Sequence, residues 1–307
     1  MTERFIFVLA IVFCLSPFAS PPIALALGIV MALTIGHPFQ KYNSKATKML
    51  LQVSVVGLGF GMNFGNVLEA GRSGILFTIA TIFGTLTLGY FIGQWLKVER
   101  KTSHLISSGT AICGGSAIAA VGPVLGANEN QMSVALGTVF ILNSVALFIF
   151  PIIGSYLNLS QTQFGIWAAI AIHDTSSVVG AAAKYGDEAL RIATTVKLAR
   201  ALWIVPVALG TSFFFKSEKK KVTIPYFIFL FVLASVVRTY VPLGTKIFDG
   251  LVSIAKAGLV LTLFLIGAGL SRATMRAVGF KPFIEGVILW LVIGSVSLWA
   301  VTSLINN

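Results

Sequence analysis

Apolar stretches long enough to cross a lipid bilayer fill most of this sequence. A spanning helix needs about 20 mostly apolar residues, and clusters of Gly, Pro and charged residues divide the chain into eleven such stretches. Only 10% of its 307 residues are charged, against about 25% in a soluble domain. The sequence therefore predicts an all-α polytopic membrane protein, and it excludes a soluble enzyme, a nucleic-acid-binding protein and a disordered chain.

The predicted spans are residues 4–16, 22–36, 46–65, 73–95, 103–125, 130–157, 163–184, 187–214, 224–240, 249–271 and 281–304. The first twenty residues, with Arg4 and an apolar run from Phe5 to Leu15, are similar to a signal peptide, but Pro21 disfavours a cleavage site after Ser20. We therefore interpret this run as the first membrane helix. Residues 1–307 form one transmembrane domain in this prediction, with 22–157 and 163–304 as possible repeat halves.

The net charge of +12 is interpreted through the membrane, because Lys and Arg near span ends accumulate on the cytoplasmic side. With the N-terminus inside, the inside segments hold fourteen Lys and Arg. The outside segments hold five, which are Arg72, Lys184, Arg191, Arg238 and Lys246. We therefore expect a cytoplasmic N-terminus, an outside C-terminus and contact with the lipid bilayer.

Two distant segments resemble each other at a constant offset of 208 residues. Leu58–Asn63 reads LGFGMN and Ile266–Ser271 reads IGAGLS. Their spans, the third and the tenth, run in opposite directions in the predicted topology. Many secondary transporters are built on inverted-topology repeats, and the similarity suggests that arrangement. The alternative is that such small residues serve close helix packing, as they do in many membrane proteins.

The fifth span contains a segment that is poorly suited to a continuous helix. Ser107–Ala117 reads SSGTAICGGSA, with adjacent glycines at its centre and hydroxyl groups on both sides. An unwound backbone inside a membrane must be buried in protein or line a water-filled cavity. The N-terminal end of a half-helix there favours an anion. The alternative is an ordinary helix packed through its small residues.

The seventh and eighth spans carry charges near the membrane midplane. Asp174 follows His173 inside an apolar span, and a charge there costs at least about 2.5–3.5 kcal/mol. Lys197 and Arg200 are three residues apart on one side of a helix, about 12–17 Å deep. One acid with two cations favours an anionic ligand, unless the charges form only a structural salt bridge. Glu285 is expected to reach the membrane surface, because it lies near a helix end.

These spans, together with Asn143 at a similar depth in the sixth span, supply the candidate site. The candidate substrate-binding residues are Ser108, Gly109, Thr110, Cys113, Gly114, Gly115, Ser116, Asn143, His173, Asp174, Thr175, Ser176, Lys197 and Arg200. The sequence has no His-Glu-x-x-His motif and no second midplane Asp, and in the fifth span Ile106 occupies the first Gly position that a rhomboid-type Gly-x-Ser-Gly would need before Ser108-Gly109. We therefore expect no enzymatic activity, no metal site and no cofactor other than a coupling ion such as H⁺ or Na⁺.

Three runs carry a family resemblance: Ser108–Ala117, Ala171–Ser176 and Val196–Arg200. Together they resemble the YeiH-like family of bacterial membrane proteins, usually labelled sulfate exporters, over nearly the whole chain. The first half is also similar to the fold of bile-acid/sodium symporters and sodium/proton antiporters. The resemblance implies a bacterial inner-membrane protein whose panel and core domains hold substrate between them.

The resemblance leaves the second crossing helix open. Sequential pairing of the halves makes the tenth span the partner of the broken fifth. The His173-Asp174 segment instead lies in the seventh span.

The sequence as a whole predicts a secondary transporter that exports a small anion by alternating access, with sulfate or a related sulfur oxyanion as the substrate that the resemblance implies. A cation/proton antiporter using Asp174 is the leading alternative. A non-transporting membrane scaffold is the third, although it leaves the midplane polar residues unexplained. A homodimer is compatible with each of these.

Overall fold

The computed structural model describes residues 2–16, 18–65, 75–215, 226–241, 245–269 and 279–305. Throughout these ranges the regular structure is helical, which confirms the all-α prediction. The helices are α1 (Thr2–Cys14), α2 (Pro21–Thr34), α3 (Gln40–Gly59), α5 (Ile75–Trp95), α6 (Arg100–Ala111), α7 (Gly115–Leu125), α8 (Glu129–Tyr156), α9 (Gln161–Ala171), α10 (Thr175–Tyr185), α11 (Asp187–Ala201), α12 (Ile204–Phe214), α13 (Tyr226–Tyr240), α14 (Thr245–Gly269) and α16 (Phe280–Leu304).

Each predicted span corresponds to one helix or to two consecutive helices. Five helical segments are long and apolar enough to cross a membrane: 77–95, 130–156, 187–214, 246–269 and 280–304. Shorter apolar helices cover 23–34, 115–125 and 229–240. These helices confirm a membrane protein, and the count of eleven spans stays a prediction. Arg72, the lysines of 216–221 and Ser271, used for the orientation and the repeat, lie outside the described ranges.

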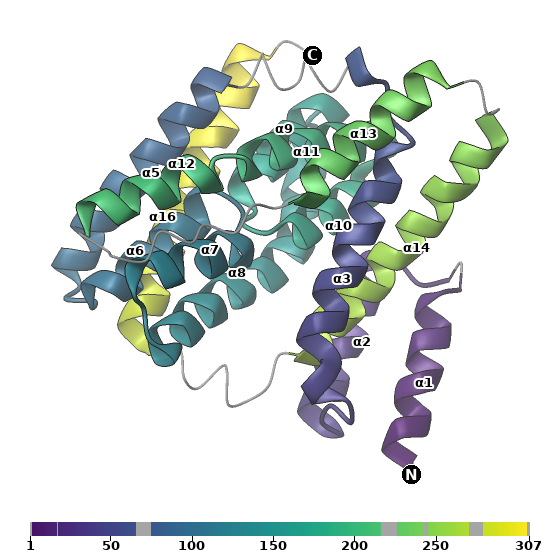
Figure 1. The fold of residues 1–307 in the computed structure, drawn as a ribbon, viewed down its shortest axis with the longest axis horizontal. Helices are drawn as coiled ribbons and strands as arrows, with labels where there is room; N and C mark the ends of the chain where they lie inside the picture. Colours follow the sequence, from purple (N-terminus) through teal and green to yellow (C-terminus); the bar gives the residue numbers. More distant parts are fainter. Residues whose placement is uncertain are drawn as a thin grey trace.

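The helices form two bundles, seen side by side in Figure 1. The panel contains α1, α2, α3, α13 and α14, in which α14 packs against both α2 and α3. The core contains α5 to α12 together with α16. Helix α10 contacts α2 and α14, and so joins the core to the panel. We name the two bundles the panel and the core, after the two domains that the family resemblance implies.

Small residues bring the panel helices into close contact. A Cβ atom added to Gly28 of α2 would lie 2.2 Å from the Phe264 carbonyl oxygen of α14. At the start of α3, Asn43 Nδ2 donates to the Leu265 carbonyl oxygen at the end of α14 (2.9 Å), and Gly57 near the end of α3 packs against Ala255. Helices α3 and α14 are therefore antiparallel, as the predicted topology requires.

The glycines of the two similar segments serve this packing. A Cβ on Gly59 would lie 2.5 Å from the Phe231 carbonyl oxygen of α13. A Cβ on Gly267 would lie 2.4 Å from the Leu25 carbonyl oxygen of α2. Close helix packing therefore explains why glycines occur in both segments. This is the alternative to an inverted repeat, and the repeat itself stays a prediction.

Two helices of the core are broken near their centres. The first break, at residues 112–114, separates α6 from α7, and the second, at residues 172–174, separates α9 from α10. Helix α14 is continuous from Thr245 to Gly269, so the second broken helix is the seventh stretch and not the tenth. The sequences at the breaks are similar at an offset of 60 residues, AICGGS for 111–116 and AIHDTS for 171–176.

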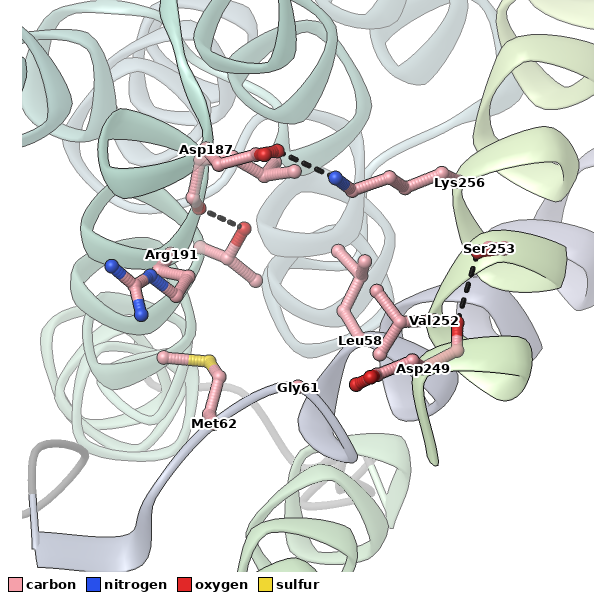
Figure 2. Close-up of a pocket in the computed structure, with 11 residues that line it drawn as sticks. Leu58, Gly61, Met62, Asp187, Arg191, Asp249, Val252, Ser253 and Lys256 are labelled. Atoms are coloured by element: carbon pink, nitrogen blue, oxygen red, sulfur yellow. Dashed lines mark hydrogen bonds and ion pairs between the residues drawn. The ribbon is translucent and has the colours of Figure 1, made fainter. Parts of the chain in front are cut away.

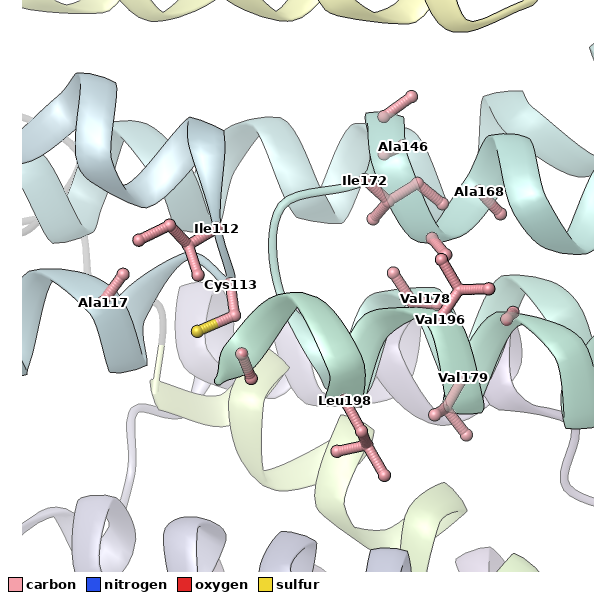
Figure 3. Packing of buried hydrophobic residues seen from close by; sticks show 14 of the residues in the cluster. Ile112, Cys113, Ala117, Ala146, Ala168, Ile172, Val178, Val179, Val196 and Leu198 are labelled. Atoms are coloured by element: carbon pink, nitrogen blue, oxygen red, sulfur yellow. The ribbon is translucent and has the colours of Figure 1, made fainter. Parts of the chain in front are cut away.

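Apolar side chains enclose both breaks. Figure 3 shows Ile112 and Cys113 of the first break with Ile172 of the second and Val178 and Val196 of neighbouring helices. Ile112 and Ile172 are fully buried, and all five residues belong to one hydrophobic cluster. The unwound backbone is therefore held inside protein, as a membrane requires.

Candidate functional site

The first break depends on a glycine. Gly114 has φ +63° and ψ −125°, a backbone conformation that residues with a Cβ rarely adopt. Its N–H donates to the Gly109 carbonyl oxygen (2.8 Å), which closes the end of α6. A Cβ on Gly114 would lie 3.0 Å from the Cβ of Asp174. The two breaks therefore touch each other, and there is no room for a side chain between them.

Asn143 of α8 supports the second break. Its Oδ1 accepts from the backbone N–H of His173 (3.1 Å) and from that of Asp174 (3.4 Å). These are N–H groups that a continuous helix would direct to its own carbonyls. Asn143 is buried, and its side-chain carbonyl takes the place of the helical acceptors that these two N–H groups lose where α9 ends.

Asp174 is the N-cap residue of α10. One carboxylate oxygen accepts from the Ser177 N–H (2.9 Å) and from the Ser176 hydroxyl, and the other accepts from the Ser177 hydroxyl (3.0 Å). A carboxylate at a helix N-terminus pairs with free N–H groups and with the positive end of the helix dipole. These contacts explain how an acid is accommodated in the membrane interior. Thr175, also buried, begins α10 beside it.

The two cations of α11 bind backbone carbonyls at the ends of the broken helices. Lys197 Nζ donates to the Ile172 (2.7 Å) and Ala169 (3.2 Å) carbonyl oxygens of the second break. Arg200 donates through one terminal nitrogen to the Ala111 carbonyl oxygen at the end of α6. Both side chains are fully buried. Each cation thus lies at the negative end of a half-helix, and neither forms a salt bridge with Asp174 within the described ranges.

Several buried polar atoms around the breaks have no hydrogen-bond partner in the part of the chain that is described. They are Ser108 Oγ, Thr110 Oγ1, Asn143 Nδ2, His173 Nδ1 and Nε2, and Arg200 Nε. Buried polar atoms in proteins are almost always paired. A group of unpaired donors and acceptors at one place therefore suits a polar ligand or ordered water.

The N-terminus of α7 adds backbone donors at the same place. The N-cap residue Gly114 has no side chain to cap the helix, and no side-chain cap hydrogen bond is present. The N–H groups of Gly115 and Ser116 have no partner among the described residues. Ser116 is exposed, so this end of the helix is open.

Two of the candidate glycines serve packing. A Cβ on Gly115 would lie 3.2 Å from the ring of Phe140, and a Cβ on Gly109 would lie 2.9 Å from the side chain of Ile118. We therefore assign Gly109 to the contact between α6 and α7, and Gly115 to the contact between α7 and α8.

A cavity of about 430 Å³ lies between the panel and the core (Figure 2). Its walls come from the end of α3, from α11 and from α14: Leu58, Gly61, Met62, Asp187, Leu190, Arg191, Thr194, Asp249, Val252, Ser253 and Lys256. Lys256 Nζ of α14 pairs with Asp187 Oδ1 of α11 at 2.5 Å, across the boundary between the bundles. Arg191 has no ion-pair or hydrogen-bond partner through its side chain among the described residues.

Helix α11 carries residues of the cavity wall and a residue that binds the second break. Asp187, Arg191 and Thr194 follow one side of α11, and Lys197 occupies the next turn of the same side. Thr195 Oγ1 lies 3.5 Å from Met62 Sδ, where α11 meets the end of α3. One helix therefore contributes both to the cavity wall and to the second break, although no residue of either break lines the cavity.

The sequence did not identify three parts of this region. Thr81 of α5 accepts from Arg200 (2.8 Å), but one Thr among several in an apolar span gives no signal. Lys256 and Asp187 lie 69 residues apart in sequence, which hides their pairing. Glu285 is fully buried beside Ser103. The expectation that Glu285 reaches the membrane surface is wrong, because α5 and α6 cover it.

The fold and the site together define a multi-pass helical membrane protein in which two broken helices meet inside one bundle. The chain belongs to the family described as conserved hypothetical protein 698, whose sequence pattern matches residues 5–286. No solved structure matches this chain.

Three relatives carry the name UPF0324 membrane protein. The protein of Bacteroides thetaiotaomicron is 58% identical, covering 91% of this chain and 85% of the relative. The protein of Porphyromonas gingivalis is 55% identical, and the match covers 92% of this chain and 88% of the relative. That of Shewanella oneidensis is 51% identical, covering 96% and 94%. These names support a membrane protein and assign no substrate.

Proposed function

We propose that this protein is a secondary transporter of a small anion, which it moves by alternating access between panel and core. The observation that carries the proposal is the contact between the two helix breaks, Gly114 against Asp174. Broken helices place backbone donors and acceptors inside a membrane protein, and transporters bind their substrates at such ends. The cavity at the panel–core boundary is lined by α11 as far as Thr194, about one helical turn from Lys197, and this proximity supports a route toward the breaks.

The charge at the breaks supports an anionic substrate. Lys197 and Arg200 outweigh Asp174 there, and all three are buried. Because both cations already donate to backbone carbonyls, they would attract an anion mainly through their field, with Arg200 Nε as a donor that is unpaired within the described ranges. Direct contact falls to the unpaired groups, such as Asn143 Nδ2, the Ser108 hydroxyl and the N–H groups of α7. Neutral donors of this kind suit an oxyanion with several acceptor oxygens.

The identity of the transported anion and the direction of transport are proposed from the family resemblance. Proteins of the resembling family are labelled sulfate exporters, so we propose sulfate or a related sulfur oxyanion, moved outward across the bacterial inner membrane. The distribution of Lys and Arg supports a cytoplasmic N-terminus and an outside C-terminus. H⁺ or Na⁺ is the proposed coupling ion, and no enzymatic step is proposed.

A cation/proton antiporter has less support from the geometry. It would use Asp174 as the ion-binding carboxylate, but both oxygens of Asp174 accept hydrogen bonds from the first turn of α10. A scaffold protein would leave two buried breaks and their unpaired polar atoms without a purpose. The anion transporter accounts for both features.

The first test measures binding and transport of sulfate, sulfite, thiosulfate, phosphate and chloride. An anion at 100 times its Kd should stabilise the purified protein by about 2.7 kcal/mol. Arg191→Gln should weaken this effect and slow uptake into proteoliposomes, because it removes an unpaired cation from the cavity wall. Lys281→Gln removes the same charge from an exposed position at the start of α16 and should have no effect. Equal responses of the two variants would contradict the proposed route.

Asp174→Asn separates the anion transporter from the antiporter. Asn caps helices about as well as Asp, so this variant should keep the fold while it removes the charge. Anion affinity should persist or rise, because a negative charge beside the ligand is gone. Loss of all transport, together with cation-dependent proton flux in the wild type, would support the antiporter instead.

A further inference from the structure

Glu285 is a carboxyl group enclosed by helices of the core. It lies in the second turn of α16 and is fully buried. A Cβ added to Gly93 of α5 would lie 3.3 Å from Glu285 Oε1 and 2.0 Å from Ser103 Oγ of α6. The neighbouring Gly286 packs against Thr138 of α8. Close packing through these glycines therefore leaves the carboxyl group no access to the membrane surface.

The two oxygen atoms close to the Ser103 hydroxyl indicate whether Glu285 is protonated. Ser103 Oγ lies 2.5 Å from Glu285 Oε1 and 3.2 Å from the Gly89 carbonyl oxygen. A serine hydroxyl has one proton, so with an ionised Glu285 it can satisfy only one of these two acceptors. If Glu285 carries a proton on Oε1, that O–H donates to Ser103 Oγ, and Ser103 donates to Gly89. With a protonated Glu285, both contacts of the Ser103 hydroxyl, to Glu285 and to Gly89, are hydrogen bonds.

No cation neutralises Glu285 in the described part of the chain. Glu285 Oε2 has no partner there, and no salt bridge includes this residue. The titratable groups on the packed elements have other contacts or are exposed: Glu99 with Gln131, Arg100 with the rings of Tyr90 and Phe215, Lys101 with the Gly126 carbonyl, His104 with Thr211, and Lys281 at the surface. An ionised carboxylate with a single donor would be unfavourable in this place.

We propose that Glu285 is a proton-binding site of the membrane-embedded core, and that it holds a proton in the conformation described here. Release of this proton to solvent water would leave a charge between α5, α6 and α16 that only water or a cation could stabilise. Either would require α6 to move away from α16. Because α6 ends at the first break, with Ser108 and Thr110 in its last turn, proton release would also shift the candidate binding residues.

The coupling part of this inference rests on the proposed function, whereas the protonation itself does not. Infrared spectroscopy tests the protonation directly. At neutral pH the wild type should show the C=O band of one protonated carboxyl group, shifted in D₂O and absent from Glu285→Gln. Ser103→Ala should keep this band at a changed frequency, because the hydrogen-bond acceptor is removed. Glu99→Gln, a control at an exposed position, should leave the band unchanged.

Transport in proteoliposomes tests the coupling. If one proton enters in exchange for each anion that is exported, a pH difference of one unit, about 1.4 kcal/mol, supports a roughly tenfold anion gradient. Glu285→Gln, which imitates the protonated acid, should bind the anion normally but show no dependence on the pH gradient. The wild-type pH response in this variant would overturn the coupling, and absence of the carboxyl band would overturn the proton site. A carboxyl band without any anion transport in the wild type would refute the proposed function alone.

Discussion

Lys197 and Asn143 together replace the hydrogen bonds that α9 loses at its break. In a continuous helix the His173 N–H would donate to the Ala169 carbonyl oxygen. Here the N–H donates to Asn143 Oδ1 (3.1 Å), and the carbonyl accepts from Lys197 Nζ (3.2 Å), which also binds the Ile172 carbonyl oxygen (2.7 Å). Two side chains from different helices thus hold the break open.

The perturbation is Lys197→Met, alone and combined with Asn143→Ala. An unpaired buried acceptor costs about 1–3 kcal/mol, so the two carbonyls freed by Lys197→Met cost about 2–6 kcal/mol. Removing a buried ammonium group offsets several kcal/mol of desolvation, and we expect a net loss of about 2 kcal/mol. Asn143→Ala leaves two backbone N–H groups unpaired, at about 2–3 kcal/mol in total because one bond is long.

The double variant should lose less stability than the sum of the two single variants. Once both side chains are gone, the His173 N–H and the Ala169 carbonyl can bond to each other and extend α9. The expected coupling free energy is about 1 kcal/mol, well outside the roughly 0.3–0.5 kcal/mol scatter of independent sites.

The assay is equilibrium unfolding in mixed micelles, followed by circular dichroism. Ser144→Ala on α8 is the matched control, because its hydroxyl donates only to the Phe140 carbonyl of its own helix (2.9 Å). The control should lose less than about 0.5 kcal/mol. Additive losses in the double variant, or wild-type stability in Lys197→Met, would refute the assignment of Lys197 to the α9 carbonyls.

Three further predictions concern the first break, the panel–core boundary and the topology. Gly114→Ala should lower stability by about 1–3 kcal/mol, because φ +63° with ψ −125° is a backbone conformation that residues with a Cβ rarely adopt, with a lower melting temperature and weaker anion binding; an unchanged melting temperature would contradict the strained geometry. Cysteines replacing Asp187 and Lys256, joined by a short cross-linker, should block transport until the link is cleaved, whereas neutralising this exposed pair should change stability by less than about 1 kcal/mol; transport that continues across the link would show that the boundary does not move. In intact cells a membrane-impermeant thiol reagent should label a cysteine at Asn130 but not one at Lys41, and the reverse pattern would invert the predicted orientation.

The sequence alone determined the fold class and the position of the first helix break. Long apolar stretches with few charges admit only helices in a membrane, because each backbone polar group must find a partner inside its own segment. The residue types at both breaks carry a similar local signal, although the choice between the seventh and the tenth stretch as the second broken helix needed the tertiary structure. Gly114 has a positive φ, and Asp174 caps a new helix start. Both residue types favour helix ends over helix interiors.

The partners of the buried charges were decided by the tertiary structure. Lys197 binds a carbonyl 25 residues away, and Arg200 binds one 89 residues away. Their spacing and depth suggested direct ligand binding, although their hydrogen bonds close the ends of half-helices. Hydropathy gives the depth of a residue in the membrane but not the direction in which its side chain points, and that direction depends on which helices pack beside it. For the same reason Glu285 was expected at the surface and lies buried between α5 and α6, where neighbouring glycines allow the helices to approach.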